Sequence, residues 1–232
     1  MIKNTDLKTS PKQRIIIALI AIFMLGSTFA LYAGIVLNAS NSSSSGVTVT
    51  AEEEDRYNEL MTEYQEKVDK QAADLSSKYF KTFSKYKDRA KSFNQADIDD
   101  IYKKDLKEGT GAKVTDAEFT DYAAYYIGWL KDGTVFDSSF DDVKEPTSLK
   151  TPLIGNANMI EGWKQGIIGM RIGGIREISI PAALAYGDED NGTIPANSAL
   201  KFVIMLIDPI EEVEVSEELE KLWYKINYGV EM

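Results

Sequence analysis

Three patterns of hydrophobic and polar positions divide this chain, and each predicts a different kind of element. The first is an uncharged run of 23 residues, 15–37, with the sequence IIIALIAIFMLGSTFALYAGIVL. A helix rises about 1.5 Å per residue, so a run of this length spans the roughly 30 Å hydrocarbon core of a bilayer. The run therefore predicts a transmembrane helix at residues 15–37.

Charge around this run predicts its orientation. No basic residue follows the run until Arg56, whereas four precede it: Lys3, Lys8, Lys12 and Arg14. The positive-inside rule places residues 1–14 in the cytoplasm and the rest of the chain outside the membrane. A cleaved signal peptide is the alternative, but its apolar region usually covers only about 7–15 residues. We therefore favour an uncleaved signal anchor, and cleavage stays open.

The second pattern is helical and begins after a Ser-rich linker, residues 38–50, which has the composition of a flexible tether. Apolar residues then recur every three or four positions, close to the 3.6-residue helical period. They are Tyr57, Leu60, Tyr64, Val68, Ala72, Leu75, Tyr79, Phe83, Tyr86, Ala90 and Phe93. The spacing predicts one long helix or two with a continuous apolar stripe, and 96–102 adds a short helix.

Two interpretations of this helical region, residues 51–104, stay open. In the first it is a spacer whose stripe packs on the globular domain or on a sister helix. In the second the stripe is a homodimerisation arm, through residues 51–93, or a surface that cradles client proteins. We favour a spacer or dimer contact, because an aromatic stripe at helical spacing more often serves packing than ligand binding.

The third pattern covers residues 105–212 and mixes one short helix with strands. Ile160, Trp163 and Ile167 lie at i, i+3 and i+7, which predicts a helix with one buried face. Glycines at 169, 173 and 174 end that helix. Ile178 and Ile180 then predict a strand that stops at Pro181.

The remaining strands complete an α+β fold. Residues 119–130 predict an aromatic-rich strand, and the turn Lys131-Asp132-Gly133-Thr134 makes it the first arm of a hairpin. Residues 200–207 are apolar at nearly every position, so this strand is expected to be central. Four to six antiparallel strands with one short helix result. Residues 213–232 form an acidic, helical tail.

Composition excludes several function classes. The chain has 232 residues, a formal net charge of −11, no cysteine and no histidine. Thiolate nucleophiles, disulfides, histidine acid–base chemistry and most zinc sites are therefore excluded. The acidic balance disfavours nucleic acid as a partner. We expect no metal and no cofactor.

Several ordered motifs resemble the FKBP-type peptidyl-prolyl cis-trans isomerases. They are Met159-Ile160-Glu161-Gly162-Trp163, Gly169-Met170 with Gly173, Ile180-Pro181, Ala185-Tyr186-Gly187 and Val135-Phe136-Asp137-Ser138-Ser139. The resemblance runs from about 105 to 211, roughly half of the chain. It implies a twisted antiparallel sheet wrapped around the short helix, and a membrane-anchored bacterial member of the family.

The resemblance also implies a reaction and its residues. Rotation about an X-Pro amide breaks no covalent bond, and a dry aromatic pocket favours the twisted, less dipolar amide. Tyr126, Asp137, Ile160 and Tyr186 look like the catalytic residues: Ile160 through its backbone N–H, Tyr186 through its phenol, and Asp137 by orienting Tyr126. The substrate-binding residues implied are Trp163 as pocket floor, Phe136 and Phe202 as walls beside Tyr126, and Met159 and Ile194 at the rim.

The sequence departs from the family pattern at three places. Leu149 or Lys150 stands where an aromatic wall is common, Asp141 or Asp142 replaces a basic residue, and the loop at 188–191 is acidic. We expect an isomerase acting on proline-containing, unfolded or flexible clients outside the cell membrane, with macrolides as further ligands. A non-catalytic FKBP-like chaperone or binding module is the alternative.

Overall fold

The computed structural model describes residues 48–155 and 159–230. The predicted transmembrane helix at 15–37 and most of the Ser-rich linker lie outside these ranges. Among the helices within them, none combines the length and apolarity that a membrane crossing requires. The described residues divide into two compact units, one within 68–212 and a smaller one in which residues 48–67 join residues 213–230.

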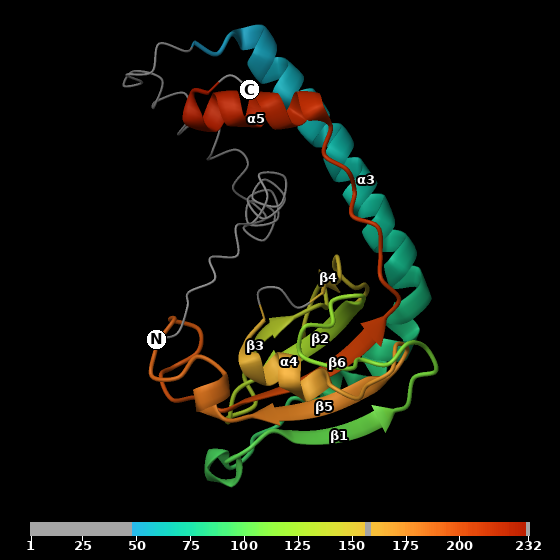
Figure 1. Cartoon of the computed structure of the whole chain (residues 1–232), viewed down its shortest axis with the longest axis vertical. Helices are drawn as coiled ribbons and strands as arrows, with labels where there is room; N and C mark the ends of the chain where they lie inside the picture. Colours follow the sequence, from blue (N-terminus) through green and yellow to red (C-terminus); the bar gives the residue numbers. More distant parts are fainter. Residues whose placement is uncertain (1–47, 156–158, 231–232) are drawn as a thin grey trace. The chain divides into compact units, whose positions relative to one another are not determined.

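The larger unit is built on one antiparallel sheet of six strands (Figure 1). Their order is β1-β5-β6-β2-β3, with β4 pairing β2. The strands are β1 Tyr102–Lys107, β2 Ala123–Trp129, β3 Val135–Ser138, β4 Leu153–Ile154, β5 Ile175–Ile180 and β6 Leu200–Ile207. β6 is central, as its apolar sequence predicts, because both of its faces are covered. The α+β class and the β2–β3 hairpin are confirmed.

Helix α4, Glu161–Ile167, lies within the curve of this sheet (Figure 1). Two glycines on its inner face allow the close approach to β5. A Cβ at Gly162 would stand 2.1 Å from the Ile180 side chain, and one at Gly166 would stand 2.8 Å from that of Ile178. The predicted helix and its buried face are therefore confirmed, and Gly169, with φ +88°, follows the helix as predicted.

The opposite face of the sheet is covered by the end of α3, Ala51–Phe83. Phe83 is fully buried, and its ring stacks on that of Phe140 with centroids 5.2 Å apart. Tyr125 of β2 lies beside it, with ring centroids 6.4 Å apart. In this second hydrophobic core, the C-terminal part of the predicted apolar stripe packs against the sheet of the same chain.

The prediction of a continuous helical stripe to Phe93 is wrong. The α-helix ends at Phe83, a 3-10 helix, η1 Ser84–Arg89, follows, and Asp88 has non-helical angles. Beyond it the N–H of Phe93 donates to the carbonyl of Lys131 at 2.9 Å. Tertiary packing beside the hairpin turn therefore overrides the helical period in this segment.

The segment before the sheet also differs from expectation. Of the helix expected at 96–102, only the 3-10 turn η2, Gln95–Asp97, forms, and Tyr102 begins β1 ahead of residue 105. β1 has the sequence YKKDLK and is exposed at almost every position. An edge strand with so little buried surface carries no hydrophobic alternation, and this is why the pattern does not reveal it.

The smaller unit pairs the first part of α3 with α5, Glu217–Tyr228. Leu60, Met61, Leu219 and Trp223 form its buried cluster. Arg56 donates two hydrogen bonds of 2.9 Å to the Glu218 carboxylate. Ser216 caps α5 by accepting from the Leu219 N–H at 3.2 Å, and Gly229 closes it in the left-handed conformation. The tail is helical over this range.

Candidate active site

Four aromatic rings gather between α4 and the sheet, and Trp163 lies at their centre. Its indole meets the rings of Tyr126 and Phe202 edge-to-face, each with centroids 5.5 Å apart and interplanar angles of 88° and 86°. Phe136 packs on Phe202 in the same way, at 5.5 Å and 87°. These four residues were all predicted as pocket residues, and the structure brings them together.

The β2–β3 hairpin positions the predicted catalytic pair. The Tyr126 hydroxyl donates a 2.5 Å hydrogen bond to Oδ2 of Asp137, whose Oδ1 accepts from the Ser138 N–H at 2.8 Å. The backbone of Tyr126 is held by Ser139, whose Oγ accepts the Tyr126 N–H at 2.9 Å. The Asp-Ser-Ser turn therefore fixes both partners, and the contact agrees with an orienting role for Asp137.

The hydroxyl of Tyr126 stays protonated through an unusually wide pH range. Burial raises its pKa well above the ordinary value for tyrosine, and the negative charge of Asp137 and the hydrogen bond to it raise it further. The phenol is therefore a hydrogen-bond donor and not a base at neutral pH.

Tyr186 lies near the same carboxylate. Partial burial raises the pKa of its phenol, and the charge of Asp137 adds to this effect. The ring is 40% exposed and follows the 3-10 turn η3, Ala182–Leu184. Gly187, with φ +63°, turns the chain directly after it, and its N–H donates to the Ala182 carbonyl at 2.9 Å. The predicted phenol thus lies beside the ring cluster and open to solvent.

Ile160 stands at the N-cap of α4. Its carbonyl accepts from the N–H groups of Trp163 and Lys164 at 3.0 and 3.3 Å, whereas its own N–H has no acceptor among the residues that the structure describes. Met159 and Ile160 are partly buried against the hydrophobic core that contains Trp163 and Phe202. The position of Met159 agrees with its predicted place at the rim, and the Ile160 N–H agrees with its predicted role as donor to a substrate carbonyl.

Ile194 differs from its expected place. It is 3% exposed and belongs to the hydrophobic core on the α4 side, so it is buried and does not line an open rim. Its N–H donates to the Asn191 side chain at 2.8 Å, which holds the loop in place. Trp163 and Phe202 expose only 1% and 5% of their surface. Trp163 and Phe202 are therefore covered, whereas Tyr126 and Phe136 are partly exposed.

The departures from the family pattern have structural explanations. Leu149 packs into the core on the other face of the sheet, so it is no pocket wall. Asp141 accepts from the N–H and the hydroxyl of Thr147, at 3.0 and 2.5 Å, and Asp142 accepts from the N–H groups of Lys144 and Glu145. Both acids therefore organise their own loop.

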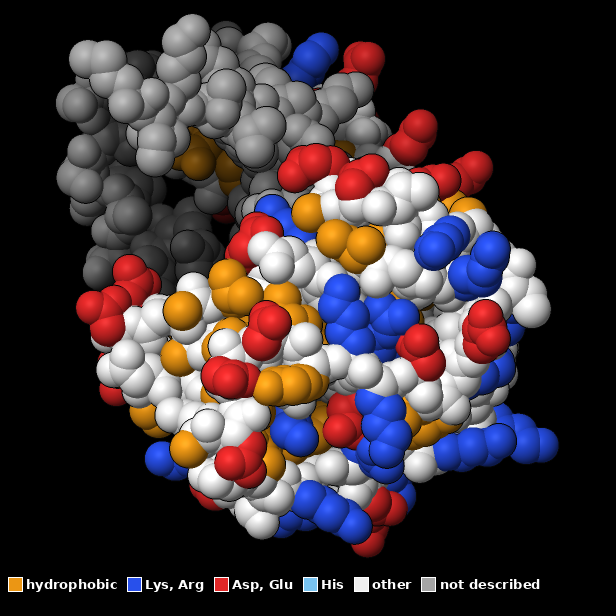
Figure 2. All heavy atoms as spheres, turned by 60° about the horizontal axis from the view of Figure 1, so that its bottom comes forward, with side chains coloured by type: hydrophobic (Ala, Val, Ile, Leu, Met, Phe, Trp, Pro, Cys, Tyr) orange, Lys and Arg blue, Asp and Glu red, His pale blue; other side chains and the backbone are white. Residues whose placement is uncertain are grey.

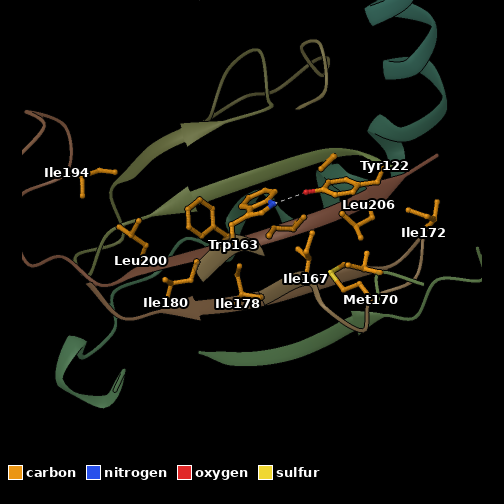
Figure 3. Packing of buried hydrophobic residues seen from close by; sticks show 14 residues of the cluster. Tyr122, Trp163, Ile167, Met170, Ile172, Ile178, Ile180, Ile194, Leu200 and Leu206 are labelled. Carbon is orange, nitrogen blue, oxygen red and sulfur yellow. Dashed lines mark hydrogen bonds between the residues drawn. The ribbon is translucent and has the colours of Figure 1, made fainter. Parts of the chain in front are cut away.

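Two residues near the site were not predicted. Tyr122 accepts a 3.2 Å hydrogen bond from Nε1 of Trp163 (Figure 3). Arg176 of β5 donates to the carbonyls of Gly166 and Ile168 at 3.0 and 2.9 Å, and its Nε donates to Asp105 at 2.6 Å. Residue parity along β2 places Tyr122, Ala124 and Tyr126 on one face, which is a signal that could have found Tyr122.

Two grooves of about 250 and 330 Å³ lie away from the ring cluster. They share Phe93, Glu177 and Lys201. Glu177 pairs with Arg89 and lies 4.0 Å from the ammonium of Lys201, so these charges are matched within the chain. Figure 2 likewise shows acidic and basic side chains interspersed on the face that it presents.

Comparison with known proteins points to one family. The sequence profile of the FKBP-type peptidyl-prolyl cis-trans isomerases matches residues 117–207. An FK506-binding protein of Neisseria meningitidis serogroup B is 35% identical over 108 residues, 46% of this chain and 94% of that protein. FK506-binding protein 2 of Debaryomyces hansenii is 45% identical over 86 residues, 37% of this chain and 61% of that protein.

A solved peptidyl-prolyl cis-trans isomerase from Pseudomonas syringae is 30% identical, with a TM-score of 0.38 over 49% of this chain and 78% of that one. The profile match assigns residues 117–207 to a peptidyl-prolyl isomerase type of domain. Because the match also covers 94% of the Neisseria protein, the chain belongs to the FKBP-type peptidyl-prolyl cis-trans isomerase family.

Proposed function

We propose that this chain catalyses cis–trans isomerisation of X-Pro bonds in proteins outside the cytoplasmic membrane. The observation that carries the proposal is the Tyr126–Asp137 hydrogen bond of 2.5 Å beside the edge-to-face rings of Trp163 and Phe202. This arrangement offers an apolar floor for a prolyl ring and polar groups only at its border.

The reaction needs stabilisation of a twisted amide and no covalent step. The barrier to rotation is about 18–20 kcal/mol, because the C–N bond has partial double-bond character. The twisted amide is less dipolar than the planar one, so an apolar enclosure favours it. The N–H of Ile160 would bind a substrate carbonyl and the Tyr186 phenol would hold the flanking chain. Asp137 orients the Tyr126 hydroxyl.

Substrate binding must first expose more of the Trp163 indole. Trp163 is 1% exposed, whereas Tyr186 is 40% exposed and Met159 and Ile160 are partly buried. We infer that the partly exposed border opens when a prolyl residue enters. Rotamer changes of surface side chains take picoseconds to nanoseconds, so such opening does not limit a reaction that is uncatalysed on the scale of tens of seconds.

An isomerisation assay tests the proposal directly. The full chain in detergent is added to a tetrapeptide with one X-Pro bond, and the cis-to-trans rate is followed spectroscopically. We expect a rate above the uncatalysed one, reduced in Tyr186→Phe. Tyr102→Phe is the matched control, because Tyr102 is an exposed phenol on β1. A full-chain rate equal to the uncatalysed rate contradicts the proposal.

A non-catalytic binding module is the second candidate. The low exposure of Trp163 and Phe202 is the observation behind it, because catalysis requires these rings to become accessible to a prolyl ring. It predicts that the full chain suppresses aggregation of an unfolded client yet leaves the X-Pro rate unchanged. The same protein sample in both assays separates the two functions.

Macrolide binding is a further expectation from the family. The names of the two relatives identify them as FK506-binding proteins. We propose that FK506 occupies the same ring cluster here and inhibits isomerisation. A titration that follows the rate and tryptophan fluorescence together tests this, and an unchanged rate at saturating FK506 contradicts it.

The location outside the membrane rests on the sequence. Residues 15–37 are uncharged and basic residues precede them, which supports a membrane anchor with a cytoplasmic N-terminus. The chain contains no cysteine, so single cysteines can report its topology. In intact cells a membrane-impermeant maleimide should label Lys85→Cys and spare Ser10→Cys until the cells are permeabilised. The reverse pattern contradicts the topology.

Homodimerisation through residues 51–93 stays a prediction. Leu60 packs against α5, and Phe83 is fully buried against the sheet, both within one chain. This supports the spacer interpretation of the stripe. Sedimentation of the full chain in detergent over a range of concentrations tests it, since a constant monomer mass excludes the dimer.

A further inference from the structure

Tyr122 is a buried residue that contacts both the Trp163 indole and the segment that precedes α4. It precedes β2, its side chain is fully buried, and its hydroxyl accepts the indole N–H of Trp163 at 3.2 Å. In Figure 3 the two side chains point toward each other. The ring of Tyr122 also stacks on Phe119, with centroids 6.4 Å apart and an angle of 3°. The Tyr122 ring therefore packs on Phe119, and its hydroxyl accepts a hydrogen bond from the Trp163 indole.

The backbone of Tyr122 is tied to the chain that leads into α4. Its carbonyl accepts the N–H of Gly155 at 2.9 Å, and Gly155 has φ +60°. One residue thus contacts both the segment before the helix and the tryptophan within it. A change at Tyr122 reaches the pocket floor without any contact with substrate.

The indole needs this acceptor. A buried N–H without a partner loses its hydrogen bond to water and gains none in the protein, which is costly. Trp163 is 1% exposed, so solvent cannot supply the acceptor in place of Tyr122. The rings of Tyr126 and Phe202 meet the same indole edge-to-face, and this geometry depends on the tilt of the indole plane.

We propose that Tyr122 is a positioning residue for the isomerase reaction, which fixes the orientation of the Trp163 indole through the Nε1–Oη hydrogen bond. The proposal rests on the proposed function of the ring cluster as the prolyl site. In this proposal the hydrogen bond from Trp163 to Tyr122 keeps the indole, the floor of the pocket, in one orientation.

The chain provides a matched control in Tyr125. Tyr125 is also fully buried, but its ring packs on the opposite face of the sheet and its hydroxyl has no hydrogen-bond partner in the structure. Tyr122→Phe and Tyr125→Phe each remove one buried hydroxyl near the same strand. Only the first should alter the indole of Trp163.

Indole N–H resonances measure this directly. The chain has three tryptophans, and they differ in partner. Trp163 donates to Tyr122, Trp129 donates to the carbonyl of Lys91 at 3.1 Å, and the buried Nε1 of Trp223 has no acceptor within residues 48–155 and 159–230. Spectra of ¹⁵N-labelled full-length protein in detergent are recorded for the unaltered chain and both variants. Trp163→Phe assigns the resonance of interest.

We expect Tyr122→Phe to move the Trp163 indole resonance and leave those of Trp129 and Trp223 in place. In the peptide assay KM should rise about tenfold with kcat within about twofold, because ring orientation contributes to binding of ground and transition states alike. Tyr125→Phe should match the unaltered chain in both measurements. An unmoved Trp163 resonance, or equal KM changes in the two variants, overturns the proposal.

A milder substitution guards against loss of folding. Incorporation of 3-fluorotyrosine at position 122 keeps the ring and the hydroxyl but weakens the oxygen as an acceptor. The Trp163 resonance should shift by less than in Tyr122→Phe but in the same direction, and no shift contradicts the hydrogen bond. The resonance decides the role of Tyr122 at the indole even if the unaltered chain proves inactive, so failure of the proposed function is seen separately.

Discussion

The two faces of the sheet differ in how they treat buried aromatic residues. On the α4 face, the hydroxyls of Tyr122 and Tyr126 and the indole of Trp163 all take part in hydrogen bonds. On the α3 face, Tyr125 packs against Phe83, and its buried hydroxyl has no partner in the part of the chain that the structure describes. Both faces are apolar. The α3 face also pairs one indole, that of Trp129 with the Lys91 carbonyl at 3.1 Å, but among the described residues it offers the Tyr125 hydroxyl no partner.

This difference distinguishes the α4 face, which carries the proposed site, from the α3 face, which serves packing. A packing face gains stability from buried area alone, so an unpaired hydroxyl is tolerated at some cost. A binding face has to hold its rings in defined orientations, and directional hydrogen bonds do this. Variants on the α3 face should therefore change stability, and variants on the α4 face should change catalysis.

The largest expected effect lies on the packing face. Phe83→Ala removes a fully buried ring that stacks on Phe140. We expect a loss of about 3–5 kcal/mol in the free energy of unfolding of the larger unit, because transfer and cavity terms add. Urea denaturation measures it, with Val143→Ala at an exposed position as control. A loss below about 1 kcal/mol would show that this core is dispensable.

Alkaline pH tests the buried phenol on the other face. Burial raises the pKa of Tyr122 to about 12, although the hydrogen bond from Trp163 lowers it in part. Since an unfolded tyrosine titrates near 10, the stabilising contribution is present below pH 10 and is lost as pH rises toward 12. Two pKa units correspond to roughly 2.7 kcal/mol.

The measurement is the free energy of unfolding between pH 9 and pH 11.5. It should fall more steeply for the unaltered chain than for Tyr122→Phe, which lacks the titrating group. Parallel curves would mean that Tyr122 ionises alike in the folded and unfolded chain. Its burial would then be incomplete in solution.

A catalytic effect without loss of stability is expected at Asp137. Asp137→Asn removes the charge that holds the Tyr126 hydroxyl at 2.5 Å. We expect kcat/KM to fall about tenfold, roughly 1.4 kcal/mol, because charged acceptors make the stronger hydrogen bonds. The exposed Asp121→Asn is the control. If both variants keep full activity, the pair is not part of the catalytic site.

The smallest effect should come from Tyr125→Phe. Its hydroxyl is buried and unpaired, so its removal relieves a desolvation cost and leaves the ring contacts with Phe83 and Tyr79 in place. We expect unchanged activity and a gain of up to about 1 kcal/mol in unfolding free energy. A clear destabilisation would reveal a hidden partner for that hydroxyl and weaken the contrast between the faces.

Much of the sheet and its helix follows from local pattern. The strand at 200–207 is apolar at nearly every position, which predicted its central place, and Asp132-Gly133 predicted the hairpin. The spacing of Trp163 and Ile167 predicted α4 and its buried face. Ordered motifs then predicted the pocket residues, and of these Ile194 lies deeper than expected.

The errors occur where distant segments determine the conformation. Phe93 continues the helical period, yet its N–H pairs with Lys131, far along the chain. β1 exists because β5 offers it hydrogen bonds, and its own side chains are almost all polar and exposed. Local propensity is a weak preference, and such contacts override it.

By itself the sequence determined which segments are strands with two buried faces, where the short helix lies, and which family's motifs it carries, because periodicity and motif order are local properties. Tertiary structure alone decided that α3 ends at Phe83, that Tyr122 reaches the indole of Trp163, and that Tyr125 is left unpaired on the other face. Those outcomes depend on which side chains meet across the sheet, and no local pattern specifies the partner of a buried polar atom.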